Sequence, residues 1–224
     1  MRFLLEALAY IADPSHWDGP MGLGRMLAEH VVYSLVGVAL AALVGVPLGW
    51  WVGHTQRGRD LVAAAAGAAR ALPTLGLITL FGLVLGIGVA APMVAFVILA
   101  LPSVLTGAYT GTESADAVAV DGARASGMSE MQVLLRVEVP LGAPLLVGGL
   151  RSATLQVIAT ATLAAYTGAG GLGRLMFLGL KTQTYAMMLA SAILVIALAL
   201  VSEIVYILIQ RAVTPHGARR AQES

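Results

Sequence analysis

The residues of this sequence that could perform chemistry are few and widely separated. There is no cysteine, which excludes disulfides, thiolate metal sites and cysteine nucleophiles. The four histidines are scattered, so a histidine-built metal site is not expected; they are His16, His30, His54 and His216. Neither a phosphate-binding G-x-x-x-x-G-K-[ST] loop nor a zinc-protease helix nor a serine elbow is present. We therefore predict that the chain has no catalytic residue, no metal and no cofactor.

One glycine pattern, Gly168-x-Gly170-x-x-Gly173, has the spacing of a dinucleotide-binding loop. That function requires a strand before the glycines and a helix after them, in a βαβ unit. Here a long apolar helix is predicted before Gly168, and no parallel sheet can form. We interpret the pattern as a turn that ends this helix, with glycine at positions of positive φ.

Glu203 is the one acidic residue that the sequence places deep in an apolar segment, and an intramembrane carboxylate is by default a functional candidate. It lies about two turns from Arg211, near the end of its segment. A structural ion pair or a snorkelling carboxylate is the interpretation we favour. A proton-coupled secondary transporter would normally carry more such groups.

The composition places these residues in a membrane protein. Of the 224 residues, 58% are hydrophobic and 11% are charged, whereas about 25% of the residues of a soluble domain are charged. The mean hydropathy of +0.87 agrees. An ordinary cytosolic enzyme is excluded, and the net charge of +1 gives no electrostatic basis for binding nucleic acid. The predicted class is an all-α, multi-pass protein whose surroundings are the lipid bilayer.

Five apolar segments are long enough to span a membrane, because a hydrocarbon core of about 30 Å requires about 20 apolar residues per helix. They are expected at about residues 31–52, 61–87, 91–109, 141–167 and 185–210. We expect an N-terminal interfacial segment at 1–29, a membrane domain at 30–211 and a polar tail at 212–224. Glycines four residues apart are interpreted as close helix packing within the chain; the pairs are Gly45/Gly49, Gly82/Gly86 and Gly107/Gly111.

The basic residues predict the orientation, since cytoplasmic loops carry an excess of lysine and arginine. One side of the five-span arrangement holds most of them: Arg57, Arg59, Arg70, Arg124, Arg136, Arg211, Arg219 and Arg220. The other side holds Arg2, Arg25, Arg174 and Lys181. We therefore expect the N-terminus outside and the C-terminus in the cytoplasm, with the loop between the third and fourth spans also cytoplasmic.

That loop, residues 112–140, carries seven charged residues and cannot lie in lipid. Its first half predicts a helix over about 114–126, with Thr112 or Ser114 as N-cap and a face of small apolar residues; that face comprises Ala115, Val118, Ala119, Gly122 and Ala123. Gly127 follows where a C′ glycine is expected.

Ser129 and Gln132 form a capping box that predicts a second helix, which should stop before Pro140. The two helices make an elbow at which a partner can dock. A solvated connecting loop is the alternative, although such a loop needs neither two cap signals nor an apolar face.

The elbow resembles the EAA loop of ABC-importer permeases. Asp121-Gly122-Ala123 stands where Glu-Ala-Ala is expected, Gly127 is the loop glycine and Val139-Pro140 closes the pattern. The departures, Asp for Glu and Gly for the first Ala, keep an acid and a small residue. By this resemblance the residues that couple to an ATPase are Asp121, Gly122, Ala123, Arg124, Gly127, Met128, Ser129 and Pro140.

The resemblance extends over most of the chain, about residues 29–211, and is to the permeases of glycine betaine/carnitine/choline importers. The stretches that carry it are Glu29-His30, Ala71-Leu-Pro-Thr-Leu-Gly76, Leu85-Gly-Ile-Gly88, Leu101-Pro-Ser103 and Thr160-Ala-Thr-Leu-Ala-Ala-Tyr-Thr-Gly-Ala-Gly-Gly-Leu-Gly173.

The resemblance implies a type I ABC-importer permease fold in a bacterial inner membrane and a dimer with a second copy or a paralogue. It also implies two ATPase subunits on the cytoplasmic elbows and an extracytoplasmic binding protein that delivers a small quaternary-ammonium osmoprotectant. A permease for ergothioneine or a methionine-like amino acid is the alternative in the same class. An ion-coupled secondary transporter, or a channel, is the alternative in a different class.

The translocation pathway is predicted from hydroxyl and amide side chains within the spans. Gln156 and Thr160 lie near one face of the fourth span, with Thr162 beside them, and Thr74 and Ser103 each follow a proline. Hydrogen bonding of these groups within or between helices is the alternative.

Overall fold

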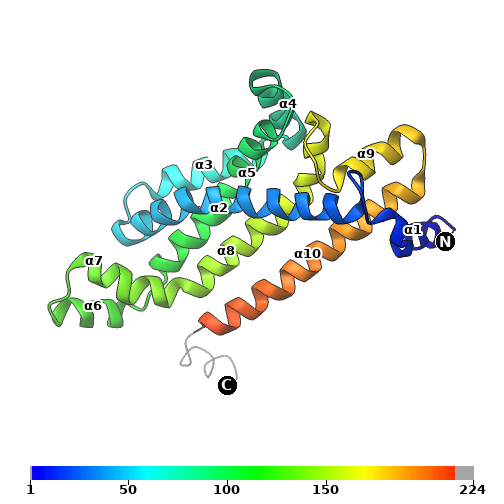
Figure 1. The fold of residues 1–224 in the computed structure, drawn as a ribbon. Helices are drawn as coiled ribbons and strands as arrows, with labels where there is room; N and C mark the ends of the chain where they lie inside the picture. Colours follow the sequence, from blue (N-terminus) through cyan, green and yellow to red (C-terminus); the bar gives the residue numbers. More distant parts are fainter. Residues whose placement is uncertain (1, 215–224) are drawn as a thin grey trace. The chain divides into compact units, whose positions relative to one another are not determined.

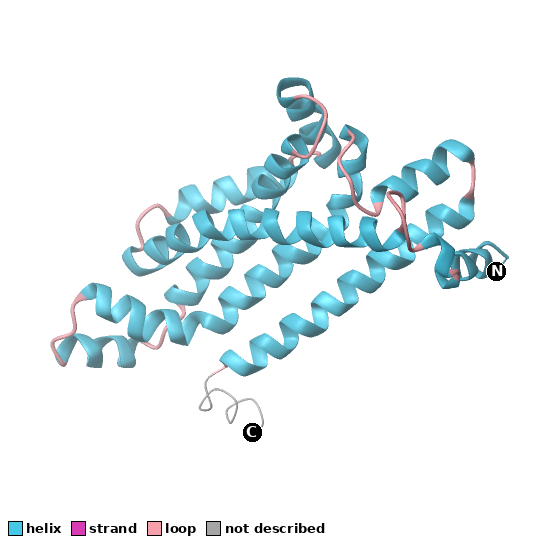
Figure 2. Ribbon diagram, in the orientation of Figure 1, coloured by secondary structure: helices cyan, strands magenta, loops and turns pink. Residues whose placement is uncertain are grey.

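The computed structural model describes residues 2–214, except for the side chain of Arg70, and within this range the chain is built of helices and loops without a strand (Figure 2). The expected all-α class is confirmed. Most of the predicted tail 212–224, with His216, Arg219 and Arg220, lies outside the described residues.

Four stretches of helix in this range are long and apolar enough to cross a membrane. They are α2 (Leu23–Thr55), α5 (Ala90–Glu113), the continuous helical stretch Glu130–Thr167 and α10 (Tyr185–Val213) (Figure 1). They coincide with the first, third, fourth and fifth predicted spans. Because α2 begins at Leu23, residues 23–29 of the predicted interfacial segment belong to this long helix.

The second predicted span, 61–87, is not one unbroken helix. It is divided into α3 (Arg59–Ala71) and α4 (Thr74–Leu85), which qualify as a fifth span only when taken together. The division falls at Pro73, which has no N–H to donate and disfavours helical backbone at the residue before it.

The described residues fold into two compact units, and each of α2, α5, α8 (Val139–Thr160) and α10 contributes to both. The first unit comprises residues within Met1–Ala39, Leu72–Leu99 and Thr154–Ser202. The second comprises residues within Leu40–Ala71, Ala100–Ala153 and Glu203–Ser224. We describe them in turn.

The first unit has an apolar core that includes the N-terminal helix α1 (Arg2–Ala12). Ala7 of α1 is buried against side chains of α2, α9 (Gly173–Thr182) and α10, in a cluster formed with Leu23, Met26, Leu172, Leu175 and Ala190. Other apolar side chains of α1 remain exposed, namely Phe3, Leu4, Leu5 and Leu8. A helix with exposed apolar side chains of this kind suits an interface between membrane and water.

The second unit is held by glycines that bring α5 against both α2 and α8. A Cβ atom at Gly49 of α2 would lie 2.7 Å from the carbonyl oxygen of Leu105. On the other side of α5, a Cβ at Gly107 would lie 2.7 Å from the Cα of Gly149. Such distances leave no room for a side chain, so the backbones themselves are in contact.

These contacts confirm that the pairs Gly45/Gly49 and Gly107/Gly111 are packing sites within the chain. The prediction for Gly82/Gly86 is wrong in part. Gly82 faces Thr167, but Gly86 has open space around it and ends α4 with a φ of +83°. Gly86 is therefore needed for the turn and not for helix packing.

We expect Gly111→Leu to destabilise the protein by about 1–3 kcal/mol, because a Cβ there would lie 2.7 Å from the carbonyl oxygen of Gly142 in α8. Gly67→Leu is the matched control, since a Cβ at Gly67 of α3 would meet nothing within 4 Å. Thermal unfolding of the purified proteins in nanodiscs measures the difference. Equal melting temperatures for the two variants would contradict close α5–α8 packing.

Candidate functional site

The candidate site is the elbow that joins α5 to α8. Its first arm is α6 (Ala117–Ala125), and its second arm begins with α7 (Glu130–Val133). The N-cap of α6 is Asp116, whose carboxylate accepts a hydrogen bond of 2.8 Å from the amide of Val118. The prediction of Thr112 or Ser114 as the cap is wrong, because α5 continues to Glu113 and both hydroxyls donate to carbonyls of that helix.

The corner of the elbow is a helix-ending turn centred on Gly127. Its φ of +83° is a conformation that residues with a side chain rarely adopt. The amide of Gly127 donates to the carbonyl of Arg124, and the amide of Met128 donates to the carbonyl of Ala123, at 2.9 and 3.2 Å. This pair of bonds is a Schellman motif, and it confirms the predicted C′ glycine.

The second arm begins at the predicted capping box. The amide of Ser129 donates to Gln132 Oε1 at 2.9 Å, and the amide of Gln132 donates to Ser129 Oγ at 3.4 Å. Two backbone donors at the helix start are thereby satisfied, and the chain re-enters a helix directly after the turn.

The prediction that this second helix stops before Pro140 is wrong. The helix continues through a π-helical turn, η2 (Leu134–Glu138), into α8 and then into the 3₁₀ helix η3 (Ala161–Thr167). Pro140 lacks an N–H and its ring crowds the carbonyl four residues earlier, and a wider turn relieves both problems. The second arm of the elbow is therefore one piece with a membrane span.

The small apolar residues predicted for one face of the first helix are divided between two faces. Ala123 of α6 and Ala115, which lies just before α6, pack inward with Val120 against Val133 of the second arm. Val118 is 79% exposed, and Ala119 and Gly122 are also exposed on the outer face. The inward face closes the elbow, and an outer face of small residues remains exposed.

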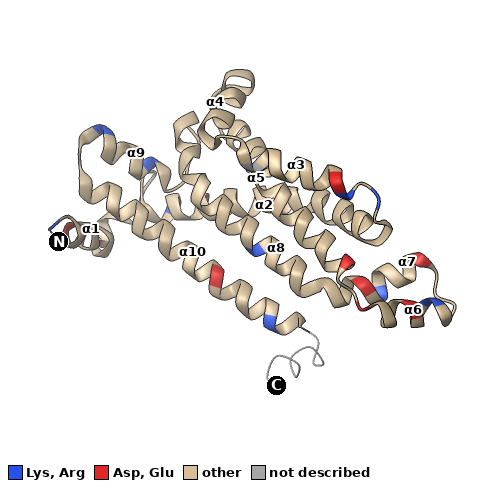
Figure 3. Ribbon diagram, turned by 180° about the vertical axis from the view of Figure 1, so that it is seen from behind, with Lys and Arg blue, Asp and Glu red and all other residues tan. Residues whose placement is uncertain are grey.

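Charged side chains gather on α6 and α7 (Figure 3). The guanidinium of Arg124 donates two hydrogen bonds of 3.0 Å to the carboxylate of Glu130 and lies 3.7 Å from Asp121. The Glu130 carboxylate raises the pKa of Arg124 above its usual value. The pair joins the two arms, although its exposure to water limits its contribution to stability.

The structure brings together the predicted coupling residues Asp121 to Ser129 in the elbow. Asp121, Gly122, Arg124, Gly127 and Ser129 are exposed, Met128 is half-buried and Ala123 is buried. Pro140 is exposed too, but it lies beyond the π turn at the start of α8. A Cβ at Gly122 would meet nothing within 4 Å, so the surface beside it is open.

Sequence reasoning missed two residues beside the elbow, His54 at the end of α2 and Glu138 in the π turn. Glu138 is buried, and its carboxylate lies 2.8 Å from the imidazole of His54. The available signal was the position of Glu138 between two apolar residues, Val137 and Val139, which predicts a buried carboxylate that needs a partner.

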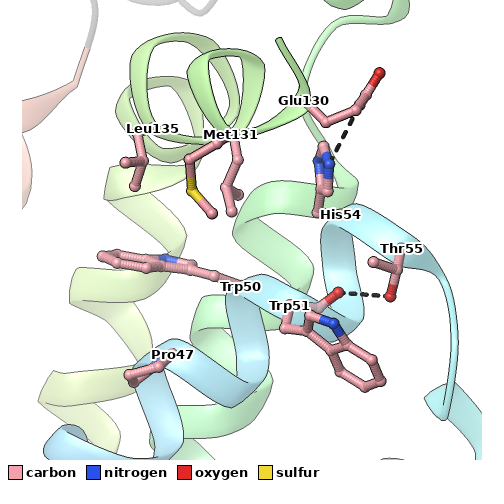
Figure 4. A pocket seen from close by; sticks show the side chains of 9 residues that line it. Pro47, Trp50, Trp51, His54, Thr55, Glu130, Met131 and Leu135 are labelled. Carbon is pink, nitrogen blue, oxygen red and sulfur yellow. Dashed lines mark hydrogen bonds and ion pairs between the residues drawn. The ribbon is translucent and has the colours of Figure 1, made fainter.

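A pocket of about 500 Å³ lies next to His54, between the end of α2 and the second arm of the elbow (Figure 4). It is lined mainly by apolar side chains, among them Pro47, Trp50, Trp51, Met131 and Leu135. Tryptophans at a helix end are typical of a membrane–water interface.

The predicted pathway residues occupy separate elements: Thr74 begins α4, Ser103 lies in α5, Gln156 and Thr160 lie in α8, and Thr162 lies in η3. The hydroxyls of Thr160 and Thr162 donate to the carbonyls of Gln156 and Ala159, each at 2.9 Å. Hydrogen bonding within the helix is therefore confirmed for these two threonines. Their role in a pathway stays a prediction.

Glu203 forms an ion pair, as favoured from the sequence, and its partner in the structure is Arg151 of α8. Nε of Arg151 donates to Glu203 Oε2 at 2.7 Å, and Nη2 donates to the other carboxylate oxygen. The sequence pointed to Arg211 because it lies about two turns from Glu203 in the same helix. In the structure the forked guanidinium of Arg151, on α8, binds both carboxylate oxygens of Glu203. Glu203 is thus a structural group that links α8 to α10.

The glycine pattern 168–173 forms a turn after the 3₁₀ helix η3, as predicted. Gly168 ends η3 in the left-handed conformation, with a φ of +77°, and Gly171 has a φ of +85°. The amide of Gly171 donates to the carboxylate of Glu29 at 3.0 Å. The turn is fastened to α2, and no strand precedes it in the described residues, so it lacks the context of a dinucleotide site.

Comparison with known proteins agrees with this architecture. Residues 45–216 match the family described as binding-protein-dependent transport system inner membrane component. The chain belongs to this family. It is therefore a membrane-embedded component of a transport system, and its multiple apolar helices agree with that location.

Relatives in the family match along nearly the whole chain. The choline transport system permease protein OpuBB of Bacillus subtilis is 32% identical over 87% of this chain and 90% of its own length. The osmoprotectant import permease protein OsmW of Salmonella typhimurium is 32% identical over 96% of this chain and 100% of its own length.

Among solved structures, the MetNI methionine ABC transporter in an inward-facing conformation matches with a TM-score of 0.76 and 22% identity. The match covers 86% of this chain and 96% of that chain. This likeness confirms the predicted type I importer permease fold.

We expect Ser129→Ala to destabilise the start of the second arm by about 1 kcal/mol, because it removes the capping box. Hydrogen exchange of the amides in residues 130–133 should become about fivefold faster. Ser126→Ala is the control, since its hydroxyl donates to the carbonyl of Gly122 and caps no amide of α7. Equal exchange at 130–133 in both variants would show that the cap does not hold this arm.

Proposed function

We propose that the chain is the permease subunit of an ABC importer that carries a small quaternary-ammonium osmoprotectant of the glycine betaine, choline or carnitine type. The observation that carries this proposal is the capped elbow between α5 and α8, with Asp121-Gly122-Ala123 and Gly127 in EAA-loop positions. The choline and osmoprotectant permeases OpuBB and OsmW, which align with at least 87% of the chain, support the substrate class.

The elbow is proposed to lie in the cytoplasm, with the N-terminus outside and the C-terminus inside. The excess of arginine on the elbow side supports this orientation. Residues 1–29 then form an extracytoplasmic interfacial segment, residues 30–211 the permease domain, and residues 212–224 a cytoplasmic tail. The exposed apolar side chains of α1 support the interfacial role.

The ATPase is proposed to dock on the outer face of α6, where Val118, Ala119 and Gly122 leave a surface of small side chains. Two ATPase subunits would bind two elbows, one in this chain and one in a second copy or a paralogue. The second arm continues into α8 as one helix, so a displacement of the elbow reaches the membrane span without an intervening loop. ATP hydrolysis belongs to the partner, and this chain contributes no catalytic residue.

An extracytoplasmic binding protein is proposed to select the substrate, since an aromatic cage recognises quaternary ammonium by cation–π attraction. Thr74, Ser103, Gln156, Thr160 and Thr162 then line the pathway in this chain. The relatives' names favour an osmoprotectant over ergothioneine or an amino acid. The ion pair of Glu203 with Arg151 disfavours Glu203 as the proton carrier of a secondary transporter.

Reconstitution in proteoliposomes tests this proposal. We expect ATP-dependent uptake of radiolabelled choline or glycine betaine when the chain is combined with its ATPase, its binding protein and any paralogous permease. We expect no uptake from the chain alone under a proton or sodium gradient. Gradient-driven uptake by the chain alone would overturn the proposal in favour of a secondary transporter.

We expect Gly127→Leu to uncouple ATP hydrolysis from uptake, because a side chain at a φ of +83° strains the corner by roughly 1–2 kcal/mol and distorts it. Uptake per ATP hydrolysed should fall several-fold while the protein still folds. Gly19→Leu is the matched control, since Gly19 has a φ of +89° and equally open surroundings but lies outside the elbow. Normal coupling in the Gly127 variant would contradict the role of the elbow.

A further inference from the structure

The imidazole of His54 lies between two carboxylates of the elbow. Its Nδ1 is 2.8 Å from Oε2 of Glu138 and its Nε2 is 3.3 Å from Oε2 of Glu130. Figure 4 shows the ring directed toward Glu130. The three groups differ in exposure, because the side chains of Glu138 and His54 are 6% and 12% exposed and that of Glu130 is 60% exposed.

The contact between His54 and Glu138 is a hydrogen bond, in which the imidazole N–H donates to a carboxylate that only accepts. A buried carboxylate is costly unless it has a partner, and His54 supplies one to Glu138. Glu130, the third member of this cluster, lies beside the other ring nitrogen and accepts two hydrogen bonds from Arg124.

A second cavity, of about 220 Å³, also borders His54 and Glu138. Asp121 and Arg124 of α6 and Glu113 of α5 line it with them. Arg124 is paired with Glu130, and Glu113 lies 3.2 Å from Arg59 of α3. Arg124 and Glu113 therefore have partners of their own, and His54 is placed against the buried Glu138.

The cluster also bridges elements that no loop connects directly. His54 belongs to the last turn of α2, Glu130 opens the second arm of the elbow, and Glu138 ends the π turn. Gly49, one turn earlier in α2, and Gly53, next to His54, are already in close contact with α5. A bond from His54 therefore holds the second arm in a set position beside the α2–α5 pair.

We propose that His54 is a positioning residue for coupling: through its hydrogen bond to the buried carboxylate of Glu138, it holds the elbow in the position from which ATPase movement reaches α8. This inference rests on the proposed function. It adds that coupling depends on a contact between the end of α2 and the π turn. Loss of this hydrogen bond leaves the Glu138 carboxylate buried without its donor from α2.

The test measures uptake per ATP hydrolysed in proteoliposomes that contain the whole complex. We expect His54→Leu, which has no group that can donate to Glu138, to give a ratio several-fold lower than the wild type. His54→Asn, whose amide nitrogen can donate from about the position of Nδ1, should restore most of the ratio.

Thr55→Val is the matched control, because the neighbouring hydroxyl donates to the carbonyl of Trp51 and accepts from the amide of Arg57, both nearby in the chain, at 2.7 and 3.4 Å. It should keep the wild-type ratio. Since His54→Leu leaves the Glu138 carboxylate buried without its donor and can fail to fold, His54→Leu/Glu138→Leu carries the same test with no buried carboxylate. An unchanged ratio in the leucine variants would overturn the positioning role.

Hydrogen exchange in the purified permease separates this inference from the proposed function. Residues 130–140 should be less protected in His54→Leu than in the wild type, and His54→Asn should restore most of the protection. Absence of ATP-driven uptake by the wild-type complex would instead overturn the proposed function. Equal protection in His54→Leu and the wild type would overturn the role of His54 whatever the transport result.

Discussion

At several glycines, the contact of α5 with α2 and α8 leaves no space for a side chain. At Gly107 and Gly149, and again at Gly111 and Gly142, the backbones of α5 and α8 meet directly. Gly49 brings α2 equally close to the other side of α5. In lipid the hydrophobic effect does not drive helices together, so close packing of small residues is a main source of their association. Since the elbow leaves α5 and returns to α8, this contact sets the spacing of its two arms.

The elbow adds local order to that spacing. Asp116, Gly127 and the Ser129/Gln132 box satisfy backbone groups at the helix ends in a segment exposed to water. The π turn at Leu134–Glu138 then carries the second arm past Pro140 into α8. A rigid corner joined to a continuous helix is the geometry that a docked ATPase needs in order to move a membrane span.

Local signals predicted most of this fold. The lengths of the apolar segments indicated the spans. The glycine at 127 and the serine at 129 indicated the turn and the second cap. These features could be predicted because they depend on neighbouring residues in the chain. The N-cap at Asp116 was missed because the length of α5 depends on its packing, which kept Thr112 inside that helix. The partner of Glu203 and the cluster around His54 join residues far apart in sequence, and neither periodicity nor spacing reports such contacts.

The central claim is that an ATPase binds the outer face of α6. Because the chain has no cysteine, a single Val118→Cys, at a position that is 79% exposed, can carry a short photo-crosslinker into the assembled complex. Leu83→Cys of α4, which is 82% exposed, is the reference position. The account predicts a covalent adduct with the ATPase subunit from position 118 and none from position 83. An adduct from position 83 alone, or from neither position in a complex that hydrolyses ATP, would contradict it.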